Sequence, residues 1–292
     1  MGQLTFDQHF AAVPAAQRQA LQRFWLDHPY TERALEGTPW RYIAMGTGRR
    51  LVVLLPHALF PADSWFLLAN ALQSEYRLLI PDGYALQKVY EPGRICETLV
   101  QMIQSEGAYS ATFIAHSTSG SPAQWLLHRW PHRVQHTVLC HSPALAPDSP
   151  LPYAGPTNLL GLLPSASLTD RTVRVLAPNL PVAGEWLQFT QAYLRLCLLG
   201  HSRRDLAQTL RAERLMRALF APEASGLESW PGKVLVVTAQ DDPYSADSLP
   251  VYQDRYPGMQ ASRFDAGGHW TQLLYPELFN ERIRRFLRES AP

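Results

Sequence analysis

The sequence of 292 residues has little of several features that identify whole classes of protein. It holds only three cysteines, Cys96, Cys140 and Cys197. They are widely spaced and odd in number, so they match neither a disulfide framework nor a zinc-binding pattern. The charges nearly cancel, at a net +1, without the basic excess typical of nucleic-acid-binding domains. We therefore expect three reduced thiols, no bound metal and no nucleic-acid partner.

Targeting and membrane segments are also missing from the sequence. The chain starts MGQLTF, without the basic region and apolar stretch of a signal peptide. Phe6 stands where N-myristoylation requires Ser or Thr. The longest apolar run, around Leu159–Leu163, is far shorter than the ~20 residues of a membrane helix. These absences predict a cytoplasmic protein that has no membrane partner.

Short apolar runs alternate with amphipathic stretches in the first half of the chain. With 46% hydrophobic residues, the sequence can build a sizeable core. A candidate edge strand is Trp40–Met45, and runs typical of strands buried on both faces lie at 51–55, 76–81, 111–116 and 134–140. Helical stretches are expected at 14–28, 64–74, 93–107 and 119–130. This alternation predicts a mostly parallel sheet with helices on both faces.

The alternation is interrupted between residue 143 and about residue 229. The segment has no comparable strand run, and it contains helical stretches at 186–199 and 203–219. Strands return at 233–239 and 260–264, and a last helix is expected at 276–288. We predict an α/β fold with an N-terminal helical extension (1–39), a core (40–142 and 230–292) and a helical cap (143–229).

The expected strand 111–116 leads directly into Ser117 and then into a helix, within the sequence AHSTSG. This is the context of a nucleophile elbow, in which a sharp strand-to-helix turn raises a serine hydroxyl above the sheet. The usual pattern is G-x-S-x-G. Here Ala115 and Ser119 hold the outer positions, and Gly120 follows. Such a turn requires a strained backbone at Ser117. Alternatively, Ser117 or Ser119 simply caps the helix.

An acid and a base follow Ser117 in the order that a serine-type triad of this kind requires. Asp242 comes just after the expected strand 233–239, although Asp241 beside it is an alternative acid. His269 lies on a glycine-rich loop before the last helix. The loop after the strand 51–55 is placed to supply a backbone N–H to an oxyanion hole, and the residue after the nucleophile, Thr118, supplies the other.

Four segments together carry a family resemblance: PHALFPADSW, AHSTSG, VLVVTAQDDPYS and DAGGHW. With them the chain resembles the α/β-hydrolase superfamily, in its branch of capped esterases, lipases and C–C hydrolases. The resemblance implies Ser117 as nucleophile, Asp242 as acid and His269 as base. It implies Leu59 and Thr118 as backbone oxyanion donors, and no cofactor. The chain departs from the family where it has His57-Ala58 in place of the common His-Gly.

Several neighbours of this site are candidates for binding a substrate: His57, Phe60, His116, Trp186 and Trp270. His57 and His116 are candidates for a second base or, alternatively, packed side chains that do not take part in the reaction. His141 is interpreted as structural or as part of a loop. Other apolar cap residues either pack the cap on the core or line an acyl pocket: Leu159, Leu160, Leu162, Leu163, Leu187, Phe189 and Tyr193. A group of arginines forms either a solvated helix face or a dock for an anionic group: Arg203, Arg204, Arg211, Arg214 and Arg217.

The function that follows as a hypothesis is hydrolysis of an ester-like bond in a small, partly apolar substrate through an acyl-enzyme. The same triad would serve a thioesterase, a C–C bond hydrolase or an acyltransferase. An alternative of another class is a ligand-binding or partner-binding protein that has a hydrolase scaffold and little turnover. The sequence specifies no oligomeric state.

Overall fold

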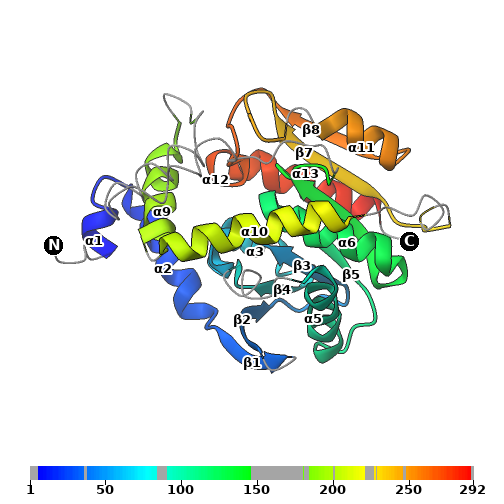
Figure 1. The fold of residues 1–292 in the computed structure, drawn as a ribbon. Coiled ribbons are helices and arrows are strands. Elements are labelled where there is room, and N and C mark those ends of the chain that lie inside the picture. Colours follow the sequence, from blue (N-terminus) through cyan, green and yellow to red (C-terminus); the bar gives the residue numbers. More distant parts are fainter. Residues whose placement is uncertain are drawn as a thin grey trace.

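The computed structural model describes residues 6–35, 38–83, 91–145, 180, 184–199, 201–220, 227, 229–245 and 248–290. In this part of the chain, eight strands form one sheet in the order β1-β2-β4-β3-β5-β6-β7-β8 (Figure 1). The pairs β1–β2 and β2–β4 are antiparallel, and all the other pairs are parallel. The strands are β1 (Thr31–Leu35), β2 (Thr38–Met45), β3 (Leu51–Leu55), β4 (Arg77–Pro81), β5 (Ala111–His116), β6 (Val134–Cys140), β7 (Val234–Ala239) and β8 (Gln260–Phe264).

The edge of the sheet differs from the sequence prediction. The expected edge strand, now β2, lies inside the sheet because β1 pairs with its outer side. The sequence of β1 is TERAL, and its side chains are exposed or half-buried. An edge strand of this kind has no apolar run, so the prediction included these residues in the helical extension instead.

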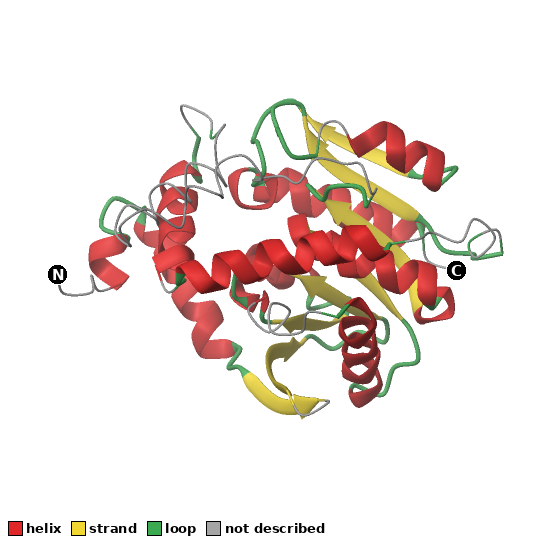
Figure 2. Cartoon of the chain, viewed as in Figure 1, coloured by secondary structure: helices red, strands yellow, loops and turns green. Residues whose placement is uncertain are grey.

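Helices lie on both sides of the sheet, and the expected helices are present within the described residues (Figure 2). The α-helices are α1 (Phe6–His9), α2 (Ala15–Asp27), α3 (Phe66–Leu72), α5 (Pro92–Ser105), α6 (Gly120–Arg129), α9 (Leu187–Leu199), α10 (Arg203–Leu219), α11 (Leu249–Arg255), α12 (Thr271–Leu274) and α13 (Pro276–Glu289). Short 3-10 turns are η1 (Ala62–Trp65), η2 (Ser117–Ser119) and η3 (Pro131–Arg133). No described helix is long and apolar enough to cross a membrane.

The sheet separates two apolar cores, and β3 contributes to both. All five residues of β3 are buried. Val52 and Leu54 pack into the core that includes residues of α2, α3 and α13. Leu51, Val53 and Leu55 pack into the core that includes residues of α5 and α6. Side chains alternate along a strand, so a strand that is covered on both faces is apolar at every position. This confirms the prediction of strands buried on both faces.

Helix α10 crosses the edge of the sheet at which the parallel strands end (Figure 1). Its residue Leu206 belongs to one core, whereas Met216, ten residues later, belongs to the other. His201, just before α10, donates a hydrogen bond from Nε2 to the carbonyl oxygen of Leu59, beyond the end of β3, at 2.7 Å. The helix therefore covers the ends of the central strands. The expected cap residues Leu159–Leu163 lie outside the described part of the chain.

Cys96, Cys140 and Cys197 are all buried thiols that form no disulfide, as predicted. Burial raises the pKa of the Cys96 thiol to about 12, so this thiol stays protonated and inert at neutral pH.

Candidate active site

Ser117 occupies a strained turn between β5 and α6. Its φ is 55°, in the left-handed region that non-glycine residues seldom adopt. This confirms the strained backbone that the sequence pattern predicted. The turn interrupts the extended chain at the end of the strand and sets the Ser117 hydroxyl above the sheet, where a base can reach it.

Small residues let the turn fit between its neighbours. The hydroxyl of Ser119 donates a hydrogen bond to the carbonyl oxygen of Pro56, at the end of β3. A Cβ on Gly120 would lie 2.3 Å from Oγ and 2.4 Å from Cβ of Ser142. Glycine is therefore required at position 120, where the start of α6 meets the loop after β6, while Ala115 and Ser119 fit at the outer positions of the elbow.

The side chains of Ser117, His269 and Asp242 form a hydrogen-bonded chain. The Ser117 hydroxyl lies 2.7 Å from Nε2 of His269. On the other side of the ring, Nδ1 lies 3.1 Å from Oδ1 and 3.2 Å from Oδ2 of Asp242. A carboxylate only accepts hydrogen bonds, so Nδ1 carries the ring proton and Nε2 accepts from the serine. All three side chains are at most 1% exposed.

Asp242 is stabilised in its charged form. Burial by itself would raise its pKa, but the attraction and hydrogen bonds of His269 and His141 outweigh burial and hold that pKa below its usual range. The backbone N–H of Tyr244 and the hydroxyl of Ser245 also donate to this carboxylate. Asp242 therefore stays ionised at neutral pH and can stabilise an imidazolium on His269.

The structure brings Asp242, not Asp241, to His269. Asp241 instead accepts hydrogen bonds from the backbone N–H groups of Gly267 and Gly268, at 3.2 Å and 2.8 Å. These glycines have φ values of 122° and 54° and form the turn before His269. Adjacent carboxylates thus have different contacts: one faces the imidazole, and the other holds the backbone of the loop that carries it.

The loop after β3 lies beside Ser117 and Thr118, but the donor that the resemblance implies from this loop is already engaged. The Leu59 N–H donates to Nδ1 of His57 at 3.0 Å. The Ala58 N–H donates to the side-chain hydroxyl of Thr118 at 3.2 Å. The Leu59 N–H can therefore donate to an oxyanion, as the sequence resemblance implies, only if its hydrogen bond to His57 is broken.

Four of the five predicted substrate-binding residues form one aromatic cluster beside His269. Trp270 packs against Phe60 and His116 with tilted rings, whose centroids are 4.8 Å apart in both pairs. His57 lies 5.3 Å from Phe60. The fifth residue, Trp186, has its ring centroid 5.4 Å from that of Phe189 on α9. Within the described residues, no ring contact or hydrogen bond joins it to Ser117, Asp242 or His269.

His116 also supports the backbone at His269. Its Nε2–H donates to the carbonyl oxygen of His269 at 2.9 Å. Burial lowers the pKa of His116 and of His57 well below the ordinary value, so both are neutral rings at pH 7. His116 is a neutral ring that donates a hydrogen bond to the main chain. This contact fits a packed, structural side chain better than a second base.

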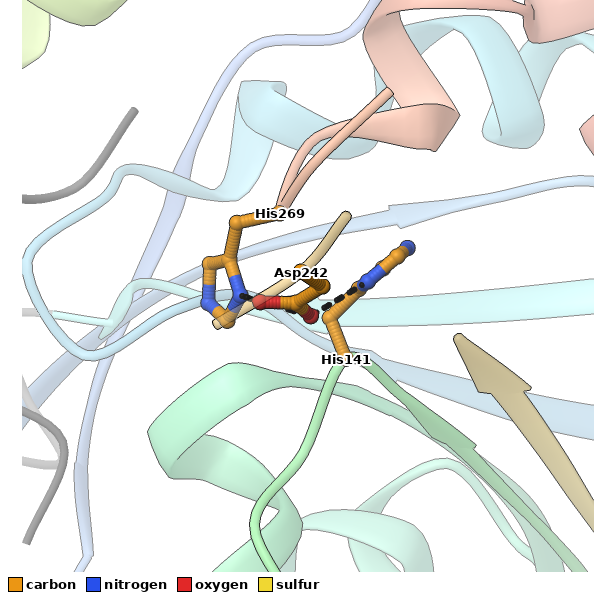
Figure 3. Close-up of side chains that lie close together, drawn as sticks. All are labelled: His141, Asp242 and His269. Carbon is orange, nitrogen blue, oxygen red and sulfur yellow. Dashed lines mark hydrogen bonds and ion pairs between the residues drawn. The ribbon is translucent and has the colours of Figure 1, made fainter. Parts of the chain in front are cut away.

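The sequence did not predict the contact between His141 and Asp242. Nδ1–H of His141 donates to Oδ2 of Asp242 at 2.9 Å, from the side opposite His269 (Figure 3). The available signal was its position directly after β6, because the carboxyl ends of neighbouring parallel strands meet at one edge of a sheet. His141 was predicted to be structural, without a partner.

The cluster of His141, Asp242 and His269 has donor atoms within 4.8 Å of one another, and such residues can ligate zinc. Both imidazole–carboxylate distances are nevertheless ordinary hydrogen-bond lengths. Ring protons account for these spacings, and Nε2 of His269 is directed at Ser117. The arrangement therefore fits proton transfer without a metal.

Helix α10 adds a buried ion pair and a small cavity beside the elbow. Arg217 Nε lies 3.0 Å from Oε1 of Glu213, which corrects the interpretation of Arg217 as part of a solvated face. Arg204, Arg211 and Arg214 are exposed, and the side chain of Arg203 lies outside the described residues. A cavity of about 30 Å³ is lined by Ala58, Ile95, Thr118, Ser119, Pro122, Thr209, Ala212, Glu213 and Met216.

No protein-family model matches the sequence, and a comparison with curated proteins gives no significant match. Solved structures do match. Carboxylesterase CesB (YbfK) from Bacillus subtilis is 17% identical with a TM-score of 0.67, and the match covers 93% of this chain and 97% of the esterase. The meta-cleavage product hydrolase CumD from Pseudomonas fluorescens IP01 is 17% identical with a TM-score of 0.70, over 89% and 98% of the two chains.

This chain has the α/β-hydrolase fold. The enol-lactonase from Burkholderia xenovorans LB400 has a similar fold, at 15% identity and a TM-score of 0.69, over 88% of this chain and 100% of the lactonase. In this fold, the position of Ser117 after β5 is the position of a nucleophile elbow. The three neighbours are named for different activities, so the fold alone does not select among them.

Proposed function

We propose that this protein is a serine hydrolase that cleaves an ester-like bond through an acyl-enzyme. The observation that carries the proposal is the hydrogen-bonded chain from Ser117 through His269 to Asp242, built on a left-handed turn at the nucleophile. A serine that only caps a helix requires neither the imidazole at 2.7 Å nor the buried carboxylate behind it.

In the first step, Ser117 Oγ attacks the substrate carbonyl while His269 Nε2 takes the hydroxyl proton. The resulting imidazolium is held by ionised Asp242 through Nδ1–H. The carbonyl oxygen becomes an oxyanion, for which we assign the backbone N–H of Thr118 and, once released from His57, that of Leu59. Each such donor is worth about 3–4 kcal/mol in the transition state.

In the second half of the reaction, the imidazolium returns its proton to the departing alcohol, and Ser117 keeps the acyl group. Water then attacks the acyl-enzyme, and His269 takes a proton from this water and passes it to Ser117. The acid product leaves, and the triad returns to its starting protonation state. The chain's own groups move every proton in this cycle.

The cavity beside Thr118 favours a small substrate group near the elbow. At about 30 Å³ it holds little more than one small group, and its walls are mainly apolar. One charged group, Glu213, also lines this cavity. We propose a small acyl or alcohol portion at this position. A thioester or a C–C bond next to a carbonyl would use the same atoms of the triad.

The test is the intact mass of the protein after incubation with a fluorophosphonate, followed by assays on ester, thioester and C–C substrates. We expect one adduct on the wild type and none on Ser117→Ala, with turnover of the best substrate reduced by about 10⁴-fold or more in the variant. Asp242→Asn should lose about 10³- to 10⁴-fold in kcat, because the wrong ring tautomer then faces the serine.

A folded wild-type protein that forms no adduct and turns over none of the substrates would refute the enzyme proposal. It would favour a ligand-binding protein with a hydrolase scaffold. Asp241→Asn serves as the matched control: it changes the neighbouring carboxylate, which holds the Gly267–Gly268 backbone, and should reduce kcat far less than Asp242→Asn.

A further inference from the structure

A second histidine contacts the acid of the triad, and the mechanism above does not use it. His141 follows β6 directly and is 0% exposed. Its ring lies on the far side of Asp242 from His269, so the carboxylate is held between two imidazoles (Figure 3). The His269 Nδ1–H faces Oδ1 most closely, and the His141 Nδ1–H faces Oδ2.

The proton positions on His141 follow from its partners. Nδ1 faces a carboxylate oxygen, so it carries the proton and donates. Nε2 then has a lone pair and accepts from the hydroxyl of Thr271 at 2.7 Å. Burial lowers the pKa of His141, although Asp242 opposes this shift, so the ring is neutral at pH 7. The ring is therefore held with its N–H directed at Asp242.

The backbone at His141 is strained in a way that supports this contact. Its φ is 51°. In the described part of the chain, His141 and Ser117 are the only non-glycine residues with a left-handed backbone. Its N–H donates to the carbonyl oxygen of Val237 on β7 at 2.8 Å. A strained residue of this kind persists where the surroundings hold it, and such residues cluster at active sites.

The contact also joins the loop of the acid to the loop of the base. Asp242 follows β7, whereas Thr271 lies two residues after His269 and begins α12. His141 bonds to both at once. It thus sets the distance between the carboxylate and the segment that carries the catalytic imidazole.

We propose that His141 is a positioning residue of the triad, which orients the Asp242 carboxylate toward His269 and withdraws part of its negative charge through the Nδ1–H bond. The inference rests on the proposed serine-hydrolase function. Without this bond, more of the charge of Asp242 acts on His269, the imidazolium is favoured, and catalysis requires a higher pH. Other titratable groups that face this cluster are His57, His116, Asp241 and Tyr244.

The test compares His141→Leu with His141→Asn in the hydrolysis of p-nitrophenyl acetate across pH. Asparagine tolerates a left-handed backbone and carries an amide N–H near the position of Nδ1, whereas leucine has no donor. We expect His141→Leu to lower kcat at least tenfold with KM changed less than twofold. The acid midpoint of its kcat/KM profile should move to higher pH. His141→Asn should recover most of kcat and the wild-type midpoint.

Thr271→Val keeps the test decisive if His141→Leu does not fold. This variant removes only the hydroxyl that holds the ring of His141, and we expect kcat to fall at least threefold with a smaller move of the acid midpoint in the same direction. An unchanged kcat and midpoint in folded His141→Leu, or in Thr271→Val, overturns the inference. Equal losses in His141→Asn and His141→Leu also overturn it.

Failure of the proposed function gives a different result. A wild-type protein that neither hydrolyses the ester nor reacts with the fluorophosphonate removes the function, and this inference with it. An active wild type with a His141→Leu variant of equal kcat and equal midpoint removes only the role of His141.

Discussion

The buried ion pair of α10 allows a quantitative prediction about how this helix packs on α6. Glu213 and Arg217 are 5% and 3% exposed. The Ser121 hydroxyl lies 2.9 Å from each carboxylate oxygen of Glu213. Burial raises the pKa of Glu213, and the nearby Arg217 opposes this shift. Ser121 is in the first turn of α6, four residues after Ser117, so the pair joins α10 to α6.

The cost of breaking this pair depends on which groups remain. Glu213→Ala leaves the Arg217 guanidinium buried without its carboxylate, which should cost about 3–5 kcal/mol. That is a large part of the ~5–15 kcal/mol by which a native protein is stable. Ser121→Ala removes one donor and keeps the pair, so it should cost about 1–2 kcal/mol. Replacing both charges, in Glu213→Leu with Arg217→Met, should bring stability back to within about 1 kcal/mol of the wild type.

Urea unfolding at pH 7, followed by tryptophan fluorescence, measures these differences. Trp125 on α6 is a suitable reporter because its Nε1–H donates to the carbonyl oxygen of Met216 on α10, at 3.0 Å. Arg214→Ala, an exposed arginine on the same helix, is the control and should change stability by no more than about 0.5 kcal/mol. The reasoning is refuted if Glu213→Ala is as stable as this control, or if the double variant is as unstable as Glu213→Ala.

Two further predictions concern the elbow and the buried histidines. Gly120→Ala places a Cβ 2.4 Å from Cβ of Ser142 and should cost about 1–3 kcal/mol of stability, with a loss of activity. Adding Ser142→Gly should restore much of the stability and of the activity, as measured by thermal unfolding and ester assays. If the second substitution restores neither, the contact is contradicted. His57, His116 and His141 have pKa values lowered by burial, so the unfolded chain binds protons that the native chain does not. Their stabilising contribution is complete above pH 6.5. As the pH falls below 6.5, the free energy of unfolding should decrease by up to about 1.4 kcal/mol per pH unit for each histidine. A urea midpoint that stays constant from pH 7.5 to 5 would contradict this pH dependence.

Local sequence determined much of the fold and of the candidate site. Strands such as β3 and β5 are buried on both faces, so they are apolar at every position and can be predicted from a short run of residues. The elbow was predictable because Ser117 directly joins a strand to a helix and is surrounded by small residues. The order of Ser117, Asp242 and His269 along the chain also needed no coordinates.

Only the tertiary structure decided how the loops meet at the edge of the sheet. It placed Asp242 against His269, whereas Asp241 accepts a hydrogen bond from the backbone N–H of Gly268. No local pattern encodes this difference between two adjacent aspartates. The tertiary structure also paired His141 with Asp242 and Arg217 with Glu213. The exposed segment β1 can be recognised as a strand only from its pairing with β2. These contacts join side chains from separate strands and helices or depend on burial by other parts of the chain. They are therefore fixed by how the elements pack and not by the residues nearby in sequence.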